Sequence, residues 1–249
     1  MATLGAQLYT VRMFLSHGSE IWDTMEKIKQ IGYTSVQLYG DARLAGVCAR
    51  AAAEAGLRIS GILADLNKYE ADLQSYLTLC EEYEIKELGV SASVTDPEEV
   101  AAYIQRANTM AERVKARGLT FSYHNHATEF IRLPDGRLVI EHYLEGFEKG
   151  LIDFMPDTYW IHCGGFDVRR FLELTEGRVK TLHLKDMKYT KDGQTFAEVG
   201  SGNLYFEGIL PLALRLGIEN FVVEQDSCDE YPLDCLRKSY EYIQSLHLL

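Results

Sequence analysis

The sequence predicts a single (β/α)8 TIM barrel that spans residues 1–249 as one domain. The chain has 249 residues, which suits one barrel of eight units. Helical and strand-like segments alternate along it, and glycines close most of the helical segments. A doubly wound sheet usually has a glycine-rich nucleotide turn after its first strand, but here Val11-Arg12-Met13-Phe14 follows that strand. These observations favour the barrel over the nucleotide-binding fold.

Glycine punctuates the repeat because its left-handed conformation ends a helix before the chain enters the next strand. The predicted stops are Gly32, Gly56, Gly118, Gly150, Gly177 and Gly217. The predicted strands, rich in β-branched and aromatic residues, are 4–10, 34–39, 58–63, 86–91, 119–125, 152–157, 179–184 and 221–224. The predicted helices are 22–30, 44–54, 72–83, 97–117, 140–148, 168–174, 205–216 and 233–246. Ser19 is a candidate cap for the first helix, and Asp96-Pro97 with Glu99 forms a capping box for the fourth.

Composition narrows the class of partner. The formal net charge is −12, which repels polyanions and argues against nucleic acid or an anionic membrane. The five cysteines are dispersed and form no Cys-x-x-Cys pair, so we expect reduced thiols. There is no long apolar run, and the first residues lack the pattern of a signal peptide. We expect a cytoplasmic protein with a small-molecule ligand, as a monomer or a homo-oligomer.

A short run of polar residues, 122–126, ends the fifth predicted strand. Side chains alternate along a strand, so His124 and His126 point to the same face. Counting from the preceding glycine stops, His124 lies six residues after Gly118, and His183 lies six after Gly177. Asp157 and Glu224 each lie seven residues after their own glycine. All four residues are therefore expected at the carboxyl ends of consecutive strands, where barrels build their active sites.

Two imidazoles and two carboxylates form a mixed nitrogen and oxygen ligand set. Such a set suits Mn²⁺ or Zn²⁺, with Co²⁺, Fe²⁺ and Mg²⁺ as alternatives. Each residue also has a simpler interpretation: Asp157 as a helix cap, each histidine as a satisfied semi-buried group, and Glu224 as an ion-pair partner of Lys185. Their common position at four strand ends favours a shared metal site.

Other polar and aromatic residues are expected at the same end of the barrel. Lys185 lies on the same strand face as His183 and can hold an anion or stabilise an oxyanion, or it can be a buried ion pair. The candidate substrate-binding residues are Glu129, Trp160, Tyr9 and Asp226. Gln7 and Gln37 are either hydrogen-bonding groups of a pocket or interior polar residues.

Several motifs resemble the sugar phosphate isomerase/epimerase family, which has the xylose isomerase-like TIM barrel. They are the segments 4–12 (LGAQLYTVR), 123–126 (YHNH), 157–160 (DTYW), 183–186 (HLKD) and 223–226 (VEQD). The resemblance covers essentially the whole chain. It implies a divalent metal held by His124, Asp157, His183 and Glu224. This chain has His124 where the epimerases and dehydratases commonly have Glu, and Trp160 where a histidine often stands.

The expected activity is a metal-dependent isomerisation or epimerisation of a ketose, keto-sugar or sugar phosphate through an enediolate. Glu224 or His126 is expected to move the proton, and His126 is the better base if Glu224 is a tight ligand. Alternatives are a dehydratase or lyase on a keto-inositol or 3-keto-sugar, and a sugar-binding barrel without catalysis. A DNA-repair nuclease on the same barrel is disfavoured by the charge.

Overall fold

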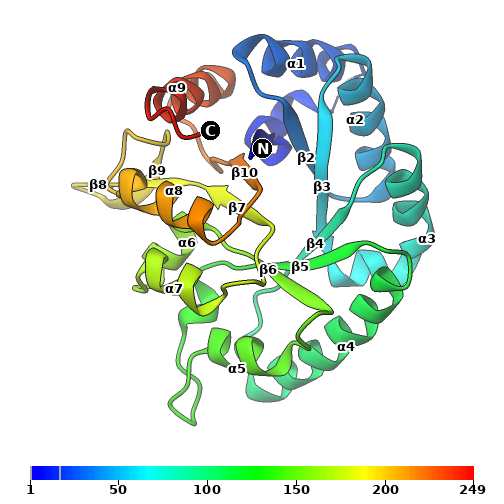
Figure 1. Ribbon diagram of the computed structural model, residues 1–249, viewed down its shortest axis with the longest axis vertical. Helices are drawn as coiled ribbons and strands as arrows, with labels where there is room; N and C mark the ends of the chain where they lie inside the picture. Colours follow the sequence, from blue (N-terminus) through cyan, green and yellow to red (C-terminus); the bar gives the residue numbers. More distant parts are fainter. Residues whose placement is uncertain (1, 17) are drawn as a thin grey trace.

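The computed structural model describes residues 2–16 and 18–249, and it confirms the barrel. Eight parallel strands form one curved sheet in the order β6-β5-β4-β3-β2-β1-β10-β7, and the helices lie around its outside (Figure 1). The strands of the sheet are β1 (Thr3–Gln7), β2 (Ser35–Tyr39), β3 (Arg58–Asp65), β4 (Glu87–Ser91), β5 (Thr120–His124), β6 (Ile152–Met155), β7 (Thr181–Leu184) and β10 (Asn220–Val223).

The α-helices of the described chain follow the strands in the expected alternation. They are α1 (Gly18–Ile31), α2 (Ala42–Glu54), α3 (Leu66–Glu82), α4 (Pro97–Lys115), α5 (Val139–Gly146), α6 (Thr158–Cys163), α7 (Val168–Leu174), α8 (Phe206–Arg215) and α9 (Pro232–Ser245). None of these helices is long and apolar enough to cross a bilayer. Buried apolar residues of the strands pack beneath the helices, which is the expected layering of such a barrel.

The barrel is nearly closed, and its seam lies between β6 and β7. Only two isolated bridges join these strands, Phe154 with Val179 and Asp157 with His183. The backbone N–H of His183 donates to the carbonyl of Pro156 at 2.8 Å. Two of the predicted metal ligands therefore face each other across the seam.

All six predicted stop glycines have positive φ values between 70° and 123°. Gly150 is not a helix stop, however, because α5 ends at Gly146 rather than at residue 148 and is followed by an extended Phe147. The helix without a glycine, α3, ends differently. Glu84, two residues after it, adopts a φ of 54° itself. Left-handed conformations are uncommon for residues with a Cβ. The turn into β4 is thus built at some backbone strain rather than with glycine.

Several boundaries differ from the predicted ones. The first strand ends at Gln7, not at residue 10, because the Gln7 side chain accepts from the N–H of Tyr9 and begins a 3-10 helix, Leu8–Phe14. Helix α1 starts at Gly18, so Ser19 lies inside it and does not cap it. Helix α3 starts at Leu66 and is kinked at Asp72, whose φ and ψ are −153° and 59°. The kink divides the helix, and the predicted helix 72–83 therefore covers only the part that follows the kink.

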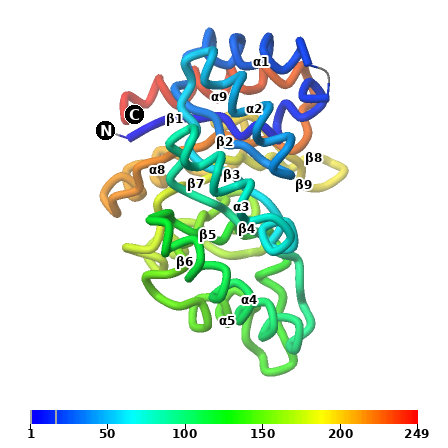
Figure 2. The backbone as a smooth tube through the Cα atoms, turned by 90° about the vertical axis from the view of Figure 1, so that its right-hand side faces the viewer, coloured from blue at the N-terminus to red at the C-terminus, as the bar shows by residue number. Residues whose placement is uncertain are grey.

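Helix α6 and the strands β8 (Asp186–Thr190) and β9 (Gly193–Ala197) were not predicted. Helix α6 has six residues, too few to show an amphipathic period. Strands β8 and β9 form an antiparallel hairpin outside the main sheet. This hairpin projects from the body of the barrel, as the yellow segment in Figure 2 shows.

Glu87 is a buried carboxylate inside the barrel at the start of β4. It accepts hydrogen bonds from the hydroxyls of Ser122 and Thr181, each at 2.5 Å. Burial raises the pKa of the Glu87 carboxyl group, and the two hydroxyl donors oppose this effect only in part.

A pH-dependent stability follows from this burial. The folded pKa of Glu87 lies above the unfolded value of about 4.3, so its contribution to stability is present below that pH and is lost as pH rises through the folded pKa. The free energy of unfolding of Glu87→Gln, relative to that of the wild type, is expected to increase as pH rises, because the amide does not ionise. The rotatable hydroxyls of Ser122 and Thr181 can pair with this amide. Urea unfolding across a pH series measures this, and a difference that does not vary with pH contradicts it.

Candidate metal centre

Four buried side chains converge at the carboxyl ends of the strands. His124 ends β5, Asp157 directly precedes α6, His183 lies in β7, and Glu224 directly follows β10. One ligand atom from each of these residues lies within 4.8 Å of the ligand atoms of the others. The four residues predicted as metal ligands are thus brought together by the fold, with side chains that are at most 6% exposed.

Asp157 serves two purposes with its two oxygens. Oδ1 accepts from the backbone N–H of Trp160 at 3.0 Å and so caps α6. Oδ2 is buried and has no hydrogen-bond partner, and it lies 3.5 Å from Nε2 of His124. The backbone N–H of Asp157 donates to Oδ1 of Asn125 at 3.1 Å, which holds the residue in place. The helix-cap interpretation and the ligand interpretation are therefore compatible.

The two histidines differ in their hydrogen bonding. Both ring nitrogens of His124 are buried without a hydrogen-bond partner. Burial, with the neighbouring His183, lowers the pKa of His124 to about 4, so its ring is neutral near pH 7. His183 is anchored on both sides, with Nδ1 3.0 Å from Oε2 of Glu224 and Nε2 2.8 Å from Oε1 of Gln37. A neutral imidazole is the form that binds a metal ion.

Lys185 places a buried ammonium group beside three carboxylates. Its Nζ lies 2.6 Å from Asp226, 3.3 Å from Glu224 and 3.5 Å from Asp157. Burial opposes the charged form, but the carboxylates, Glu224 foremost, raise the pKa of Lys185 above its ordinary value. Despite its burial, the pKa of Glu224 is in turn held well below its usual range, first by Lys185. Lys185 is thus charged and ion-paired, which agrees with the buried ion pair that was one of the two interpretations of its position in the sequence.

The backbone of Lys185 is fixed by α6. The hydroxyl of Thr158 donates to the Lys185 carbonyl at 2.7 Å and accepts from its N–H at 2.9 Å. The ammonium lies 5.0 Å from the ring centroid of Trp160 and 5.4 Å from that of Phe196 in the hairpin. Such cation–π contacts favour the charge at this place.

A cavity of about 450 Å³ opens at the cluster, where His124 and Glu224 line it. Tyr9, Tyr39, Asp65, Lys68, His126 and Asp226 are among the residues that line it. The rings of Tyr9 and Tyr39 meet edge to face, with centroids 5.3 Å apart. This volume and this polar and aromatic lining suit a small polar ligand.

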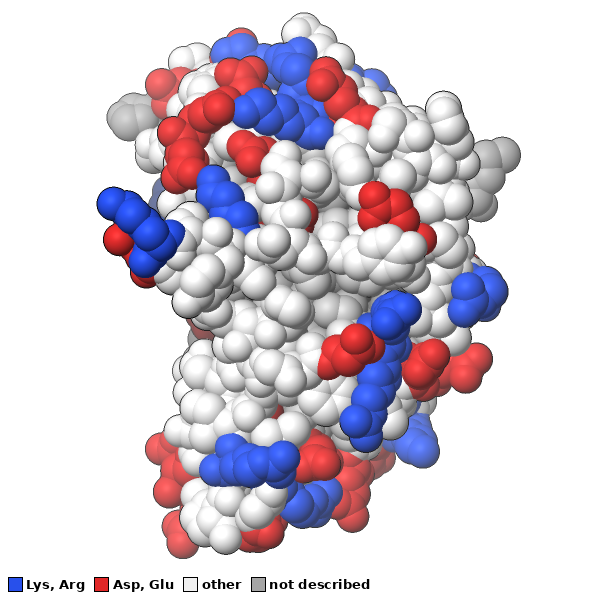
Figure 3. Space-filling view, turned by 90° about the vertical axis from the view of Figure 1, so that its left-hand side faces the viewer, with Lys and Arg blue, Asp and Glu red and all other residues white. Residues whose placement is uncertain are grey.

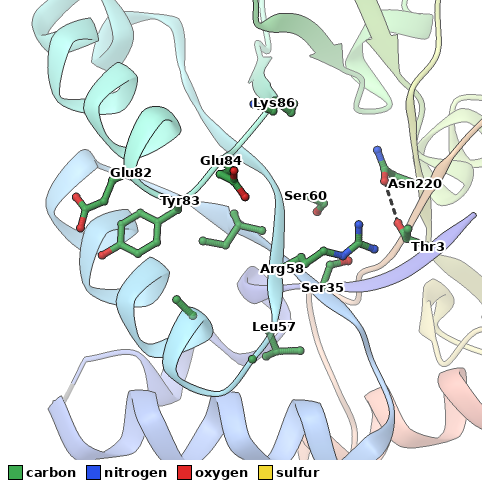
Figure 4. A pocket seen from close by; sticks show the side chains of 13 residues that line it. Thr3, Ser35, Leu57, Arg58, Ser60, Glu82, Tyr83, Glu84, Lys86 and Asn220 are labelled. Carbon is green, nitrogen blue, oxygen red and sulfur yellow. Dashed lines mark hydrogen bonds between the residues drawn. The ribbon is translucent and has the colours of Figure 1, made fainter.

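A larger cavity, of about 700 Å³, lies at the opposite end of the strands (Figure 4). Arg58, Lys86 and Glu84 line it, and Thr3 donates a hydrogen bond to Asn220 at 2.9 Å beside it. Its lining contains neither histidine nor the four-residue cluster. We place the functional site at the carboxyl ends because the four ligand-type residues converge there, with unpartnered buried atoms on His124 and Asp157.

The predicted substrate-binding residues are distributed unequally. His126, Tyr9 and Asp226 line the cavity at the cluster. The Trp160 ring lies 5.4 Å from that of His126, and its Nε1 is buried without a partner. Glu129 points elsewhere: it is 1% exposed and accepts from the hydroxyls of Tyr123 and Thr128 and from the N–H of His126. Glu129 is thus held by its own loop and is not among the residues that line the cavity.

Three further residues support the site, and for Gln37 the sequence had left open a pocket hydrogen-bonding group or an interior polar residue. Gln37 contacts a predicted ligand, and Thr158 holds Lys185. Asp186 accepts from four backbone N–H groups, those of Met187, Gly200, Gly202 and Leu204, and so ties the hairpin to the loop before α8. Glutamine within a parallel strand, as in β2, is a usable signal, since an uncharged polar group there must find a partner.

The residues present fit a divalent metal. Two imidazoles and two carboxylates converge on one place. Both His124 nitrogens and Asp157 Oδ2 are buried without a hydrogen bond, and Lys185 Nζ lies 3.5 Å from that oxygen. Buried polar atoms without partners are rare, and a bound cation would provide partners for these atoms. The fold and the site together define a TIM-barrel protein whose mouth can hold a divalent metal.

The chain belongs to the xylose isomerase-like TIM barrel family, whose sequence profile matches residues 25–246. Among solved structures, it is similar to a sugar phosphate isomerase/epimerase from Parabacteroides distasonis, with a TM-score of 0.82, 21% identity, and coverage of 98% of this chain and 94% of that chain. It also resembles a xylose isomerase-like TIM barrel protein from Mycobacterium smegmatis in complex with magnesium, with a TM-score of 0.76, 14% identity, and coverage of 99% and 96%.

A curated relative is the inosose dehydratase of Salmonella agona (strain SL483). It is 24% identical over 159 residues, which cover 56% of this chain and 51% of the relative. The match thus spans about half the length of that dehydratase.

Proposed function

We propose that this protein is a divalent-metal-dependent isomerase or epimerase that acts on a ketose or related keto-sugar through an enediolate. The observation that carries the proposal is the convergence of His124, Asp157, His183 and Glu224 within 4.8 Å at the cavity. Family membership and the structural likeness to an isomerase/epimerase support the same class of chemistry. Sequence reasoning also included sugar phosphates among the substrates.

The four residues would hold the metal, and the mixed donor set favours Mn²⁺ or Zn²⁺, while the magnesium bound in one similar structure keeps Mg²⁺ in consideration. When bound, the metal supplies Lewis acidity, which polarises a carbonyl and makes the adjacent C–H more acidic. The protein supplies the remaining steps of binding and proton transfer.

His126 is the proposed proton carrier. Its ring lies 5.0 Å from that of His124, it lines the cavity, and its Nδ1 has no partner among the described residues. Glu224 is less suited to this role because its Oε2 is shared by His183 and Lys185. Lys185 would stabilise the developing enediolate charge, since a preorganised buried ammonium does so without reorganisation. Tyr9 and Trp160 would position the sugar.

A second candidate is a dehydratase or lyase, favoured by the similarity to inosose dehydratase. The same proton abstraction would then be followed by loss of a β-hydroxyl as water. Product analysis separates the two, because a dehydratase loses water while an epimerase conserves composition. The nuclease alternative is not supported, since basic and acidic side chains are interspersed on the face in Figure 3 and the net charge is −12.

The test is elemental analysis of the purified protein, followed by solvent-deuterium exchange across ketoses and keto-sugars. Exchange into substrate that disappears with a chelator and returns with Mn²⁺ is the expected result. His126→Asn is expected to lose exchange and keep its metal. Metal-free wild-type protein that also fails to take up added Mn²⁺, Zn²⁺ or Mg²⁺ would overturn the proposal. Sugar binding without any exchange would instead support a non-catalytic barrel.

The charges of the mouth favour an uncharged sugar over a sugar phosphate. The cations that line the cavity are Lys68 and Lys185, and both are already paired, Lys68 with Asp65 at 3.6 Å. A phosphate group would meet the carboxylates of Asp65 and Asp226, and juxtaposed like charges cost several kcal/mol. For a matched pair such as D-fructose and D-fructose 6-phosphate, we expect exchange to be more than about tenfold faster with the uncharged sugar. Faster exchange with the phosphate contradicts this.

A further inference from the structure

We propose that Gln7 and Gln37 are positioning residues that fix the tautomer of His183, so that its Nδ1 is the atom offered to the metal. This inference rests on the proposed function, because it presumes a metal at the four-residue cluster. The three side chains come from β1, β2 and β7, and all three are 0% exposed. The three side chains form one chain of hydrogen bonds, and the direction of donation is certain at its Gln7 end.

At that end is the backbone N–H of Tyr9, which can only donate. It lies 3.2 Å from the Oε1 atom of Gln7, which caps the 3-10 helix that starts the first loop. Because Oε1 faces the backbone, the NH₂ group of Gln7 must point the other way. There it donates to Oε1 of Gln37 at 2.5 Å.

Gln37 is thereby oriented as well. Residues 7 and 37 are register partners in the adjacent strands β1 and β2. With Oε1 toward Gln7, the Gln37 amide directs its NH₂ at the sulfur of Met155, 3.4 Å away, which is a weak acceptor. The reversed amide would set two NH₂ groups against each other and an oxygen against the sulfur. The hydrogen-bond network therefore selects one orientation.

The same Gln37 oxygen faces Nε2 of His183 at 2.8 Å. An amide oxygen can only accept, so Nε2 of His183 must carry a proton. Nδ1 then offers its lone pair, and it lies 3.0 Å from Oε2 of Glu224. A divalent cation bound between these two atoms would accept a lone pair from each of them. Nδ1 and Glu224 are thus presented together as ligands, with Nε2 reserved for Gln37.

Nitrogen-15 NMR of histidine-labelled protein reads the tautomer directly. With Zn²⁺ as the diamagnetic probe, and His183→Gln used for assignment, we expect a protonated Nε2 and a metal-bound Nδ1 at His183. Gln37→Met removes the acceptor and is expected to abolish this pattern. Gln37→Glu restores an acceptor at the same place and is expected to recover it. A wild-type His183 that binds Zn²⁺ through Nε2 would overturn the inference.

Titration with Mn²⁺ gives an independent readout. Outer partners of a metal-bound histidine typically contribute about 10–100-fold to affinity, so Gln37→Met is expected to bind Mn²⁺ that much more weakly. Gln7→Met should also weaken Mn²⁺ binding, but by less, because without Gln7 the Gln37 amide group is free to rotate by 180°. If Gln37→Met does not fold, as judged by circular dichroism, Gln7→Met and Gln37→Glu decide the question.

Ser239→Ala is the matched control. The Ser239 hydroxyl is 1% exposed, accepts from the N–H of Val199 and donates to the Cys235 carbonyl, in the part of the barrel packed by α9. It is expected to lower stability without altering the His183 spectrum or the Mn²⁺ affinity. Wild type that binds no divalent cation would count against the proposed function. If the wild type binds a divalent cation and Gln37→Met has the same Mn²⁺ affinity and the same His183 tautomer, only the role of Gln37 is contradicted.

Discussion

Asp157→Asn is expected to empty the metal site and to lower metal-dependent exchange on the order of 10³-fold. Loss of a bound metal removes several kcal/mol of charge stabilisation from the reaction, and each 1.4 kcal/mol corresponds to about tenfold in rate. The substitution preserves shape and leaves an oxygen to accept from the N–H of Trp160, so the cap of α6 is kept. Elemental analysis and deuterium exchange measure the two effects.

Asp167→Asn provides the matched control for this prediction. Asp167 caps α7 in the same way, accepting from the N–H of Arg170 at 2.8 Å, and it is not part of the cluster. We expect it to retain wild-type metal content and exchange. If Asp157→Asn also retains both, the carboxylate is only a helix cap and the proposed metal centre is wrong.

Lys185→Met is expected to destabilise the metal-free protein by about 3–5 kcal/mol, because it removes the shared cation of a buried charge cluster. Asp157, Glu224 and Asp226 would remain together without the ammonium that now lies within 3.5 Å of each. Saturating Mn²⁺ should narrow the difference, since the metal replaces the missing positive charge and binds only the folded state. Exchange should nevertheless fall by about 10²–10³-fold, the usual cost of removing an oxyanion-stabilising donor.

Urea unfolding of both proteins, with chelator and with Mn²⁺, measures this prediction. Lys188→Met is the control, because Lys188 is 34% exposed and paired with Asp229 at the surface. Such surface pairs contribute about 0–1 kcal/mol. A metal-free Lys185→Met protein as stable as the wild type would show that the cluster does not depend on the ammonium.

The barrel and its four converging side chains could be predicted because both depend on local, periodic features. Helix-ending glycines mark the units, and counting from Gly118 or Gly177 places His124 and His183 at strand ends. In the parallel strands of one barrel, residues that lie at the same distance from the preceding helix-ending glycine are at the same end of the barrel. Convergence within 4.8 Å then follows from the fold without any knowledge of individual contacts.

The roles of single polar groups could not be predicted in this way, because they depend on partners distant in the sequence. Glu129 looked like a substrate contact, yet its oxygens turn inward to Tyr123 and to the loop backbone. Lys185 had two open interpretations until three carboxylates from two different loops were placed around it. The hairpin β8–β9 was also missed, since its register depends on pairing of short strands outside the main sheet.

The sequence by itself thus determined the fold class, the rim that carries the site and the kind of ligands gathered there, since periodicity and glycine placement act locally. Only the tertiary structure decided which atoms of those residues remain free. His183 shows the difference: its position is set by strand register, but its protonated nitrogen is set by Gln37, 146 residues earlier in the chain. Hydrogen-bond direction in a buried network depends on every member of that network, and those members meet only when the barrel closes.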